Sequence, residues 1–274
     1  MKLSLEVFPP KISDGVEKIY SCLEGLAALR PDFISVTYSA GNASKGLTRE
    51  VCVCIQEKYG VKAVSHLTCA GATKESLQDE LKKLKDSGIG ALLALRGDLV
   101  GGKKIFSYPH ATDLMREINA FGGFEICGAC YPEGHVESGS VYDDCTTLKM
   151  KYDLGVRTFL SQLFLDNADF LRMEERAKKN GIDADFAAGI MPVTSATGLI
   201  RMVGLSGAKI PNEVKEMIDK FGGDKVAMKQ AGIEYAVKQI QGLQKEGCGH
   251  IHLYTMDNAV NAKTICDGAG VFEK

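Results

Sequence analysis

Short apolar segments alternate with amphipathic segments along the whole chain. The apolar segments are bounded by glycines or polar residues, a pattern typical of strands that are buried on both faces of a parallel sheet. We expect eight strands, at Leu3–Phe8, Phe33–Val36, Ala63–His66, Ala91–Leu95, Glu125–Ala129, Arg157–Ser161, Asp185–Ala188 and His250–Tyr254. Apolar positions at helical spacing predict the helices Gly15–Leu29, Thr48–Tyr59, Lys74–Asp86, Ala111–Phe121, Val141–Leu154, Ala168–Lys179 and Lys225–Glu246.

This alternation predicts an α/β fold, a single (β/α)8 TIM barrel, because eight βα units with right-handed crossovers close naturally into a barrel. A length of 274 residues suits one such domain, and no linker or repeat divides residues 1–274. A doubly wound sheet is the alternative, but no Gly-x-Gly-x-x-Gly follows the first strand. The segment Val193–Asp224, after the seventh strand, predicts one or two short extra helices over the barrel mouth.

Composition and charge exclude several classes of protein. The 33 basic and 35 acidic residues give a net charge of −2, so no basic field would attract nucleic acid or a membrane surface. No apolar stretch has the ~20 residues of a membrane span, and no signal sequence precedes the first strand. The nine cysteines are an odd number and favour reduced thiols over a disulfide framework. We therefore expect a cytoplasmic protein.

Polar side chains follow the C-terminal ends of most expected strands, which is where α/β barrels carry their chemistry. The clearest example is Leu95-Arg96-Gly97-Asp98, where a cation, a glycine and an acid follow a small apolar run. Other strands end at Thr37 and Tyr38, His66, Tyr131, Gln162 and Tyr254. The pattern predicts that these residues share one site.

Two carboxylates are candidates for catalysis. Glu6 stands between apolar neighbours in the first strand, where poor solvation would raise its pKa into the range of a general acid. The alternative is an interior acid that is paired with a lysine or arginine. Asp98 either faces a ligand or forms a salt bridge with Arg96.

Other polar residues carry weaker signals. Tyr131 and His135 share one loop and suit a ring or a phosphate, although a turn without a ligand is an equal alternative. Asp144 and Lys151 lie seven residues apart on one helix, where solvated surface charge is the default interpretation. The Cys127-Gly128-Ala129-Cys130 segment and the pair His250 and His252 lack the partner spacing of a metal site, so no metal is expected.

Eight motifs occur in a fixed order, about one per strand end. They are Leu5-Glu6-Val7-Phe8-Pro9-Pro10, Ser35-Val36-Thr37-Tyr38, His66-Leu67-Thr68-Cys69, Ala94-Leu95-Arg96-Gly97-Asp98, Tyr131-Pro132-Glu133-Gly134-His135, Gln162-Leu163-Phe164-Leu165-Asp166, Gly189-Ile190-Met191-Pro192-Val193 and Leu253-Tyr254-Thr255-Met256. With them, the chain resembles the short bacterial methylenetetrahydrofolate reductases from about Glu6 to Gly270. The resemblance implies a flavin barrel of one-carbon metabolism and methionine biosynthesis. Such an enzyme passes hydride from a nicotinamide to flavin N5 and then to 5,10-methylenetetrahydrofolate, forming 5-methyltetrahydrofolate.

The resemblance also implies residue roles. Glu6 matches the general acid, Asp98 matches a catalytic acid near flavin and pterin, and both would contact the folate, together with Gln162 and Tyr254. The positions that match flavin contacts are Thr37, Tyr38, Ala40, His66, Arg96, Gly97, Asp98, Ala111, Tyr131, His135, Asp144 and Lys151. For Asp144 and Lys151, this reverses the default interpretation as surface charges.

Several positions depart from the family pattern. A glutamine is common near Gly198 and a phenylalanine near Met202, while Asn258 replaces a frequent arginine. Thr147 and Met150 replace an asparagine and an arginine on the cofactor helix. We therefore expect FAD, with FMN as the alternative, and NADH or NADPH as co-substrate.

The same departures leave other arrangements open. The chain would act as a homo-oligomer, or as the catalytic flavin subunit of a complex that receives electrons from a partner protein. Two further alternatives are a related flavin barrel that oxidises another secondary amine and a catalytically quiet cofactor-binding subunit.

Overall fold

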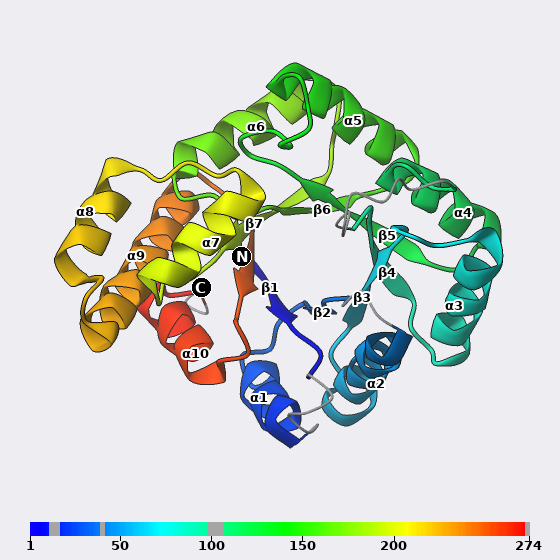
Figure 1. The fold of residues 1–274 in the computed structure, drawn as a ribbon, viewed down its shortest axis with the longest axis horizontal. Helices are drawn as coiled ribbons and strands as arrows, with labels where there is room; N and C mark the ends of the chain where they lie inside the picture. Colours follow the sequence, from blue (N-terminus) through cyan, green and yellow to red (C-terminus); the bar gives the residue numbers. More distant parts are fainter. Residues whose placement is uncertain (11–16, 39–41, 98–106, 272–274) are drawn as a thin grey trace.

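The computed structural model describes residues 1–10, 17–38, 42–97 and 107–271, and it forms a barrel of eight parallel strands (Figure 1). The strands are hydrogen-bonded in chain order, and β1 closes the barrel against β8. Their bounds are β1 Lys2–Val7, β2 Phe33–Val36, β3 Ala63–Thr68, β4 Ala91–Leu95, β5 Glu125–Cys130, β6 Thr158–Ser161, β7 Asp185–Ile190 and β8 His250–Tyr254. The expected fold class is confirmed, and strand limits differ from the expected ones by at most two residues.

Helices surround the barrel as the expected crossovers require (Figure 1). The helices are α1 Glu17–Ala27, α2 Asn42–Tyr59, α3 Lys74–Asp86, α4 Ala111–Phe121, α5 Val141–Asp153, α6 Asn167–Lys179, α7 Ala196–Ser206, α8 Asn212–Phe221, α9 Lys225–Lys245 and α10 Ala259–Gly268. The extra helices expected after the seventh strand are α7 and α8. The sequence analysis missed α10, because its buried face consists largely of small or polar residues, Asn261, Ala262, Ile265 and Cys266.

The two faces of each strand serve different cores. On β1, Leu3, Leu5 and Val7 point outward into the large apolar layer between strands and helices. Ser4 and Glu6 alternate with them and are also buried, so they point into the barrel. The interior thus combines apolar residues with polar side chains from β1 and β8. The apolar interior cluster comprises Phe33, Val64, Ala91, Leu93, Cys127, Leu160 and Ala187.

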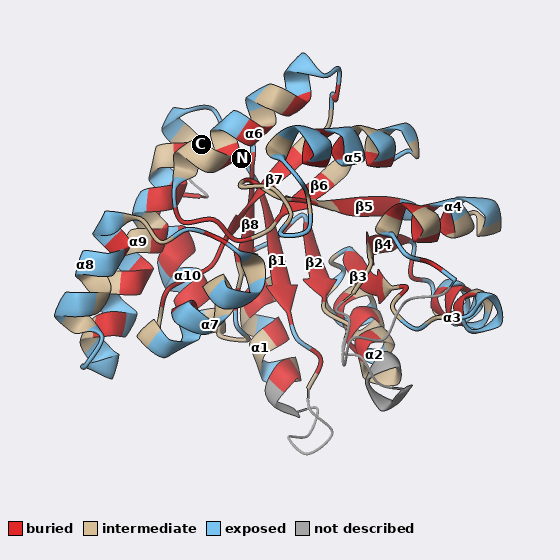
Figure 2. Ribbon diagram, turned by 45° about the horizontal axis from the view of Figure 1, so that its top comes forward, coloured by how far each residue is buried: buried red, intermediate tan, exposed pale blue. Residues whose placement is uncertain are grey.

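Helices α7 and α8 rest on an apolar cluster of their own. It includes Leu163, Met191, Leu199 and Val214, so the segment after β7 is packed against the C-terminal end of the barrel. Figure 2 shows the strands almost entirely buried and the outer faces of the helices exposed. Within the described ranges, none of the helices combines the length and the apolar character needed to cross a membrane.

Candidate active site

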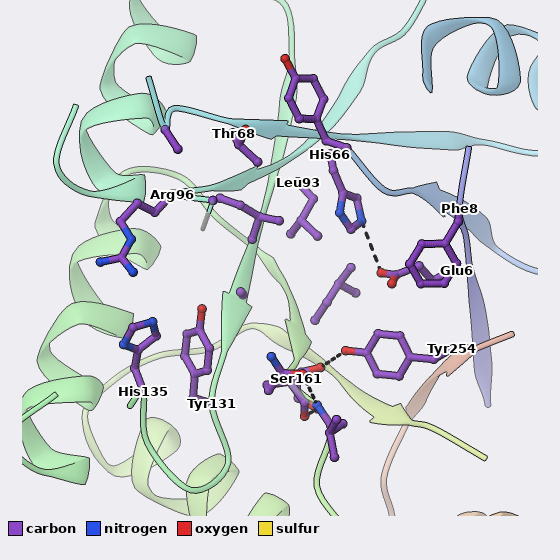
Figure 3. Close-up of a pocket in the computed structure, with 18 of the residues that line it drawn as sticks. Glu6, Phe8, His66, Thr68, Leu93, Arg96, Tyr131, His135, Ser161 and Tyr254 are labelled. Atoms are coloured by element: carbon purple, nitrogen blue, oxygen red, sulfur yellow. Dashed lines mark hydrogen bonds and ion pairs between the residues drawn. The ribbon is translucent and has the colours of Figure 1, made fainter. Parts of the chain in front are cut away.

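A cavity of about 820 Å³ opens at the C-terminal ends of the strands (Figure 3). Nine of the predicted site residues line it, namely Glu6, Tyr38, His66, Arg96, Gly97, Tyr131, His135, Gln162 and Tyr254. They come from widely separated parts of the sequence and meet because parallel strands end at the same face of the barrel. The structure thus brings these nine residues to one cavity, and their roles there remain predictions.

Glu6 lies at the base of the cavity between two buried imidazoles. Its Oε2 lies 3.4 Å from Nε2 of His66 and 3.5 Å from Nε2 of His252, and Ser35 Oγ donates to it at 3.4 Å. Burial raises the pKa of Glu6, but the two histidines outweigh it and lower the pKa to about 2. The expectation of a raised pKa is thus wrong. The apolar neighbours in sequence indicate burial of Glu6, but they do not reveal which groups face its carboxylate.

Arg96 at the end of β4 has an unexpected partner. Its guanidinium binds the Glu137 carboxylate through two nitrogens, and its Nη2 donates to Oε1 at 2.7 Å. Half of the Glu137 side chain remains exposed, at 55%. Gly97, next to Arg96, has a φ of 86°, and a Cβ there would meet Cβ of Thr68 at 3.0 Å. A glycine is therefore needed where the strand turns across its neighbour.

Tyr131 and His135 form one wall of the cavity with their rings edge to face, 4.7 Å between centroids. Lys151 lies behind this wall, where its Nζ donates to the Ala129 carbonyl at 2.7 Å and lies 5.5 Å from the Tyr131 ring centre. Burial lowers the pKa of Lys151. Asp144 accepts from the His135 backbone N–H at 3.4 Å, and burial raises its pKa.

Asp144 and Lys151 are therefore not solvated surface charges, but they do not line the cavity either. Their contacts support the tyrosine and histidine of the wall. Periodicity alone could not distinguish this arrangement from an exposed stripe.

Gln162 and Tyr254 line the cavity from the ends of β6 and β8. The Gln162 Oε1 accepts from the Leu163 N–H at 2.8 Å, which presents the amide NH2 as the donating group. The Tyr254 hydroxyl donates to the Ser161 carbonyl at 2.6 Å, as Figure 3 shows. This bond joins the phenol of β8 to the strand end that carries the amide.

Besides Asp144 and Lys151, four predicted contacts do not line the cavity or lie outside the described residues. Thr37 lies at the end of β2, where its carbonyl accepts from Thr48, and it does not line the space. Ala111, at the first position of α4, does not line it either. Ala40 and Asp98 lie outside the described residues, so their predicted roles remain predictions.

Some lining residues were not predicted. The turn after β3 contributes Ala70, Gly71, Ala72 and Thr73, and the extra helix α7 contributes Met202. The turn after β3 could have been recognised from its small residues, which directly follow the strand. Met202 lies in the segment that was expected to form extra helices over the barrel mouth, and it was named only as a departure from the family pattern.

The positions that depart from the family pattern have local roles. Asn258 caps α10, because its side chain accepts from the Asn261 N–H at 2.9 Å. Thr147 donates to the Asp143 carbonyl within α5, and Met150 is exposed on the same helix. Neither residue supplies a cation toward the cavity.

The thiols and histidines do not form a metal centre. All nine cysteines are free, and burial raises the pKa of Cys127 to about 12. Across the described ranges, no three side chains of histidine, cysteine, aspartate or glutamate are grouped so that they could hold a metal ion.

The fold and the site define a (β/α)8-barrel enzyme whose cavity places a carboxylate, an amide and aromatic walls around one ligand space. The family model "Methylenetetrahydrofolate reductase" matches residues 1–270. The chain belongs to this family.

Relatives across bacteria and plants agree. The 5,10-methylenetetrahydrofolate reductase of Pectobacterium carotovorum subsp. carotovorum is 34% identical over 273 residues, covering 99% of this chain and 91% of the relative. The Escherichia coli K12 protein of the same name is 32% identical over 272 residues, with the same coverage of both chains. The Zea mays protein "Methylenetetrahydrofolate reductase (NADH) 1" is 32% identical, but the chain covers 48% of its length.

A solved structure shares the fold. It is described as an uncharacterized protein from Clostridium thermocellum that binds two copies of 5-methyl-5,6,7,8-tetrahydrofolic acid. The TM-score is 0.65 at 15% identity, over 99% of this chain and 94% of the other.

Proposed function

We propose that this protein reduces 5,10-methylenetetrahydrofolate to 5-methyltetrahydrofolate with a bound flavin, in the cytoplasm. The observation that carries the proposal is one cavity that Glu6, Gln162, Tyr254, Tyr131 and His135 line together. This arrangement occurs in a chain whose family and curated relatives bear the name of that reaction.

The cavity suits a flavin. Its volume of about 820 Å³ lies in the range of cofactor and ligand sites, and its aromatic and imidazole wall suits a flat ring. The close approach at Gly97 gives the cofactor a surface formed by backbone, and Arg96 supplies a cation for a phosphate. Tyr38, His66, Arg96, Gly97, Tyr131 and His135 would hold the group directly, with Asp144 and Lys151 as support. When bound, the flavin supplies a hydride acceptor and donor at N5.

FAD is the cofactor that we propose, with FMN as the alternative, since no arginine of α5 is available for the second phosphate. NADH or NADPH would be the reductant, and the relative from Zea mays bears NADH in its name. We propose direct use of the nicotinamide, by a single-domain protein that acts as a homo-oligomer. The alternative is delivery of electrons by a partner subunit, because Met202 stands where the family commonly has a phenylalanine.

Each residue near the folate has a distinct task. Glu6 would protonate the folate nitrogen that leaves the methylene carbon when the five-membered ring opens. A ligand bound over Glu6 would desolvate the carboxyl further, and desolvation favours its protonated form. The Gln162 amide both donates and accepts, so it suits two substrates in turn. Tyr254, held on the Ser161 carbonyl, closes the side of the site.

Separate measurement of the two half-reactions tests this proposal. The flavin of the purified protein is identified by mass, reduced anaerobically with NADH or NADPH, and then reoxidised with 5,10-methylenetetrahydrofolate. We expect Glu6→Gln to slow the folate step by about 10²–10⁴-fold, the usual contribution of a general acid. Flavin reduction should stay within about twofold.

Glu137→Gln is the matched control, since this exposed acid lies on Arg96 and away from the folate side. Reduced wild-type flavin that methylenetetrahydrofolate fails to reoxidise would contradict the proposed reaction. Equal loss of both half-reactions in Glu6→Gln would contradict the acid role alone.

A further inference from the structure

A continuous series of polar side chains crosses the barrel interior from Glu6 to the opposite face. Behind Glu6, Nδ1 of His252 lies 2.8 Å from Oγ of Ser4. Ser4 Oγ lies 2.9 Å from Nε2 of His250, whose Nδ1 lies 2.9 Å from Oδ2 of Asp185. These residues come from β1, β7 and β8, and the strand register brings Ser4 opposite His252.

The middle of the series is isolated from solvent, and its far end is not. Ser4, His250 and His252 are at most 1% exposed. The Asp185 side chain is 28% exposed and also binds Nζ of Lys2 at 2.9 Å, at the N-terminal end of the barrel. Asp185 therefore links the buried series to solvent at the face opposite the active site.

Hydrogen-bond chemistry restricts how protons can be placed along this series. Burial raises the pKa of Asp185, but His250 and Lys2 outweigh it and leave the pKa below its usual value, so Asp185 is a carboxylate that only accepts. His250 must then donate from Nδ1. Ser4 has one hydroxyl proton, so it donates to one histidine and accepts from the other.

Two arrangements of the protons satisfy every hydrogen bond from Asp185 to His252. If His250 is doubly protonated, it donates to Ser4, Ser4 donates to His252, and the Nε2–H of His252 faces a Glu6 carboxylate. If His250 is neutral, Ser4 donates to His250, His252 carries its proton on Nδ1, and its bare Nε2 faces a protonated Glu6. Both arrangements hold the same number of protons, so they differ only in which bonds carry them.

We propose that Asp185, His250, Ser4 and His252 form a proton relay that stores on His250 the proton that Glu6 delivers to the substrate. This proposal rests on the acid role of Glu6 given above. Ser4, His250 and Asp185 are positioning residues, because they act on Glu6 through His252. The relay explains how a carboxyl whose pKa is lowered by two histidines can still act as an acid.

Delivery moves protons and no electrons. The N–H bond at His250 Nε2 breaks as an O–H bond forms on Ser4, and the former hydroxyl proton of Ser4 passes to His252 Nδ1. The Nε2 proton of His252 then passes to Glu6. His250 ends neutral, Glu6 ends protonated, and the total charge is unchanged. After Glu6 has protonated the folate, Glu6 takes one proton from water in the cavity and passes it to Nε2 of His252. His252 then gives its Nδ1 proton to Ser4, Ser4 gives its former hydroxyl proton to His250 Nε2, and the first arrangement is restored.

One contact in the series is longer than a hydrogen bond. His252 Nε2 is buried without a hydrogen-bond partner, as is His66 Nε2, and both lie about 3.5 Å from the same Glu6 oxygen. A carboxylate that moves toward His252 would complete the series. Because these two imidazole nitrogens are unsatisfied, we infer that the Glu6 carboxylate is the group that moves when the proton is transferred.

Other ionisable groups face both ends of the relay. His66 from β3 and Tyr254 from β8 face Glu6. At the far end, Lys2 faces Asp185, and the charge of Asp32 acts on Lys2. Cys248 precedes His250 and donates to its carbonyl. A pH profile of the enzyme therefore contains these groups as well, and the test compares variants with one another.

The test is Ser4→Ala, which removes the one hydroxyl that joins the two histidines. Chemically reduced enzyme is mixed with 5,10-methylenetetrahydrofolate from pH 5 to 8, and reduction by NAD(P)H is measured in parallel. We expect the folate step to slow at least tenfold at pH 7.5 and to recover as pH falls, because Glu6 must then take its proton directly from solution. Flavin reduction should change less than twofold.

Three variants complete the experiment. Ser4→Thr keeps the hydroxyl and should restore the wild-type pH profile. His250→Gln cannot store a proton, so its folate step should slow and recover at low pH as expected for Ser4→Ala. This variant tests the relay independently if Ser4→Ala fails to fold. Ser65→Ala removes a buried serine hydroxyl of β3 that lies outside the relay, and it should behave as wild type.

The relay would be overturned if both Ser4→Ala and His250→Gln kept the wild-type rate and pH profile of the folate step. In that case a slow folate step in Glu6→Gln would still support the acid role. A fast Glu6→Gln would instead overturn the acid role itself.

Discussion

The contact between α9 and the loop after β7 allows a sharp test of how the segment that leads to α7 is packed against the barrel. Gly232 lies on the buried face of α9, and a Cβ there would lie 1.9 Å from the Val193 carbonyl oxygen and 2.4 Å from its carbon. Ordinary contacts of this kind are 3.4–4 Å. Helix and loop must therefore separate by about 1.5 Å in Gly232→Ala. Both sides of the contact are backbone, so no side-chain rotation relieves it.

The expected loss of stability follows from two opposing effects. Overpacking of a closed contact costs about 3 kcal/mol, at the upper end of the usual range. Alanine favours a helix interior by about 1 kcal/mol over glycine. The net destabilisation is about 2 kcal/mol, which lowers the Tm by about 4–8 °C. The Val193 loop leads from Met191 of the cavity wall to α7, so flavin retention should fall as well.

Gly204→Ala is the matched control, because a Cβ at this exposed position of α7 meets nothing within 4 Å. It should stabilise the protein by about 0.5–1 kcal/mol through helix propensity alone. Circular dichroism follows the thermal unfolding of both variants, and flavin absorbance follows cofactor loss. A Gly232→Ala protein as stable as Gly204→Ala would refute the packing of α9 against Val193.

Three further outcomes follow from the site. Tyr254→Phe leaves the Ser161 carbonyl unsatisfied and should cost about 1–3 kcal/mol in thermal unfolding; an unchanged Tm would contradict that bond. Arg96→Met should weaken flavin binding about tenfold or more, whereas Glu137→Gln should not, as measured by fluorescence of released flavin. The Glu6 pKa of about 2 lies below the ordinary 4.5, so its stabilisation is complete above about pH 4.5 and is lost as pH falls toward 2. The difference in urea midpoint between wild type and Glu6→Gln should therefore become smaller as pH falls from 7 to 3. A difference that grows would contradict a stabilising role of the ionised Glu6.

The sequence by itself determined the barrel and the face that carries the site. Eight apolar runs, each too short for a helix and each followed by a helical pattern, leave few ways to bury every strand. Polar residues such as Arg96 and Gln162 follow those runs directly, and parallel strands place their ends together. The fold and nine lining residues could thus be predicted without knowledge of any distance.

Tertiary structure alone decided the electrostatics of the site. Glu6 has a low pKa because His66 and His252, 60 and 246 residues away in the chain, meet the same oxygen. Arg96 pairs with Glu137, 41 residues later in the chain, and Ser4 joins two histidines across the closure between β1 and β8. Residue order fixes which side chains lie on a strand, but ionisation depends on charges within a few ångströms. Those neighbours are set only when the barrel closes.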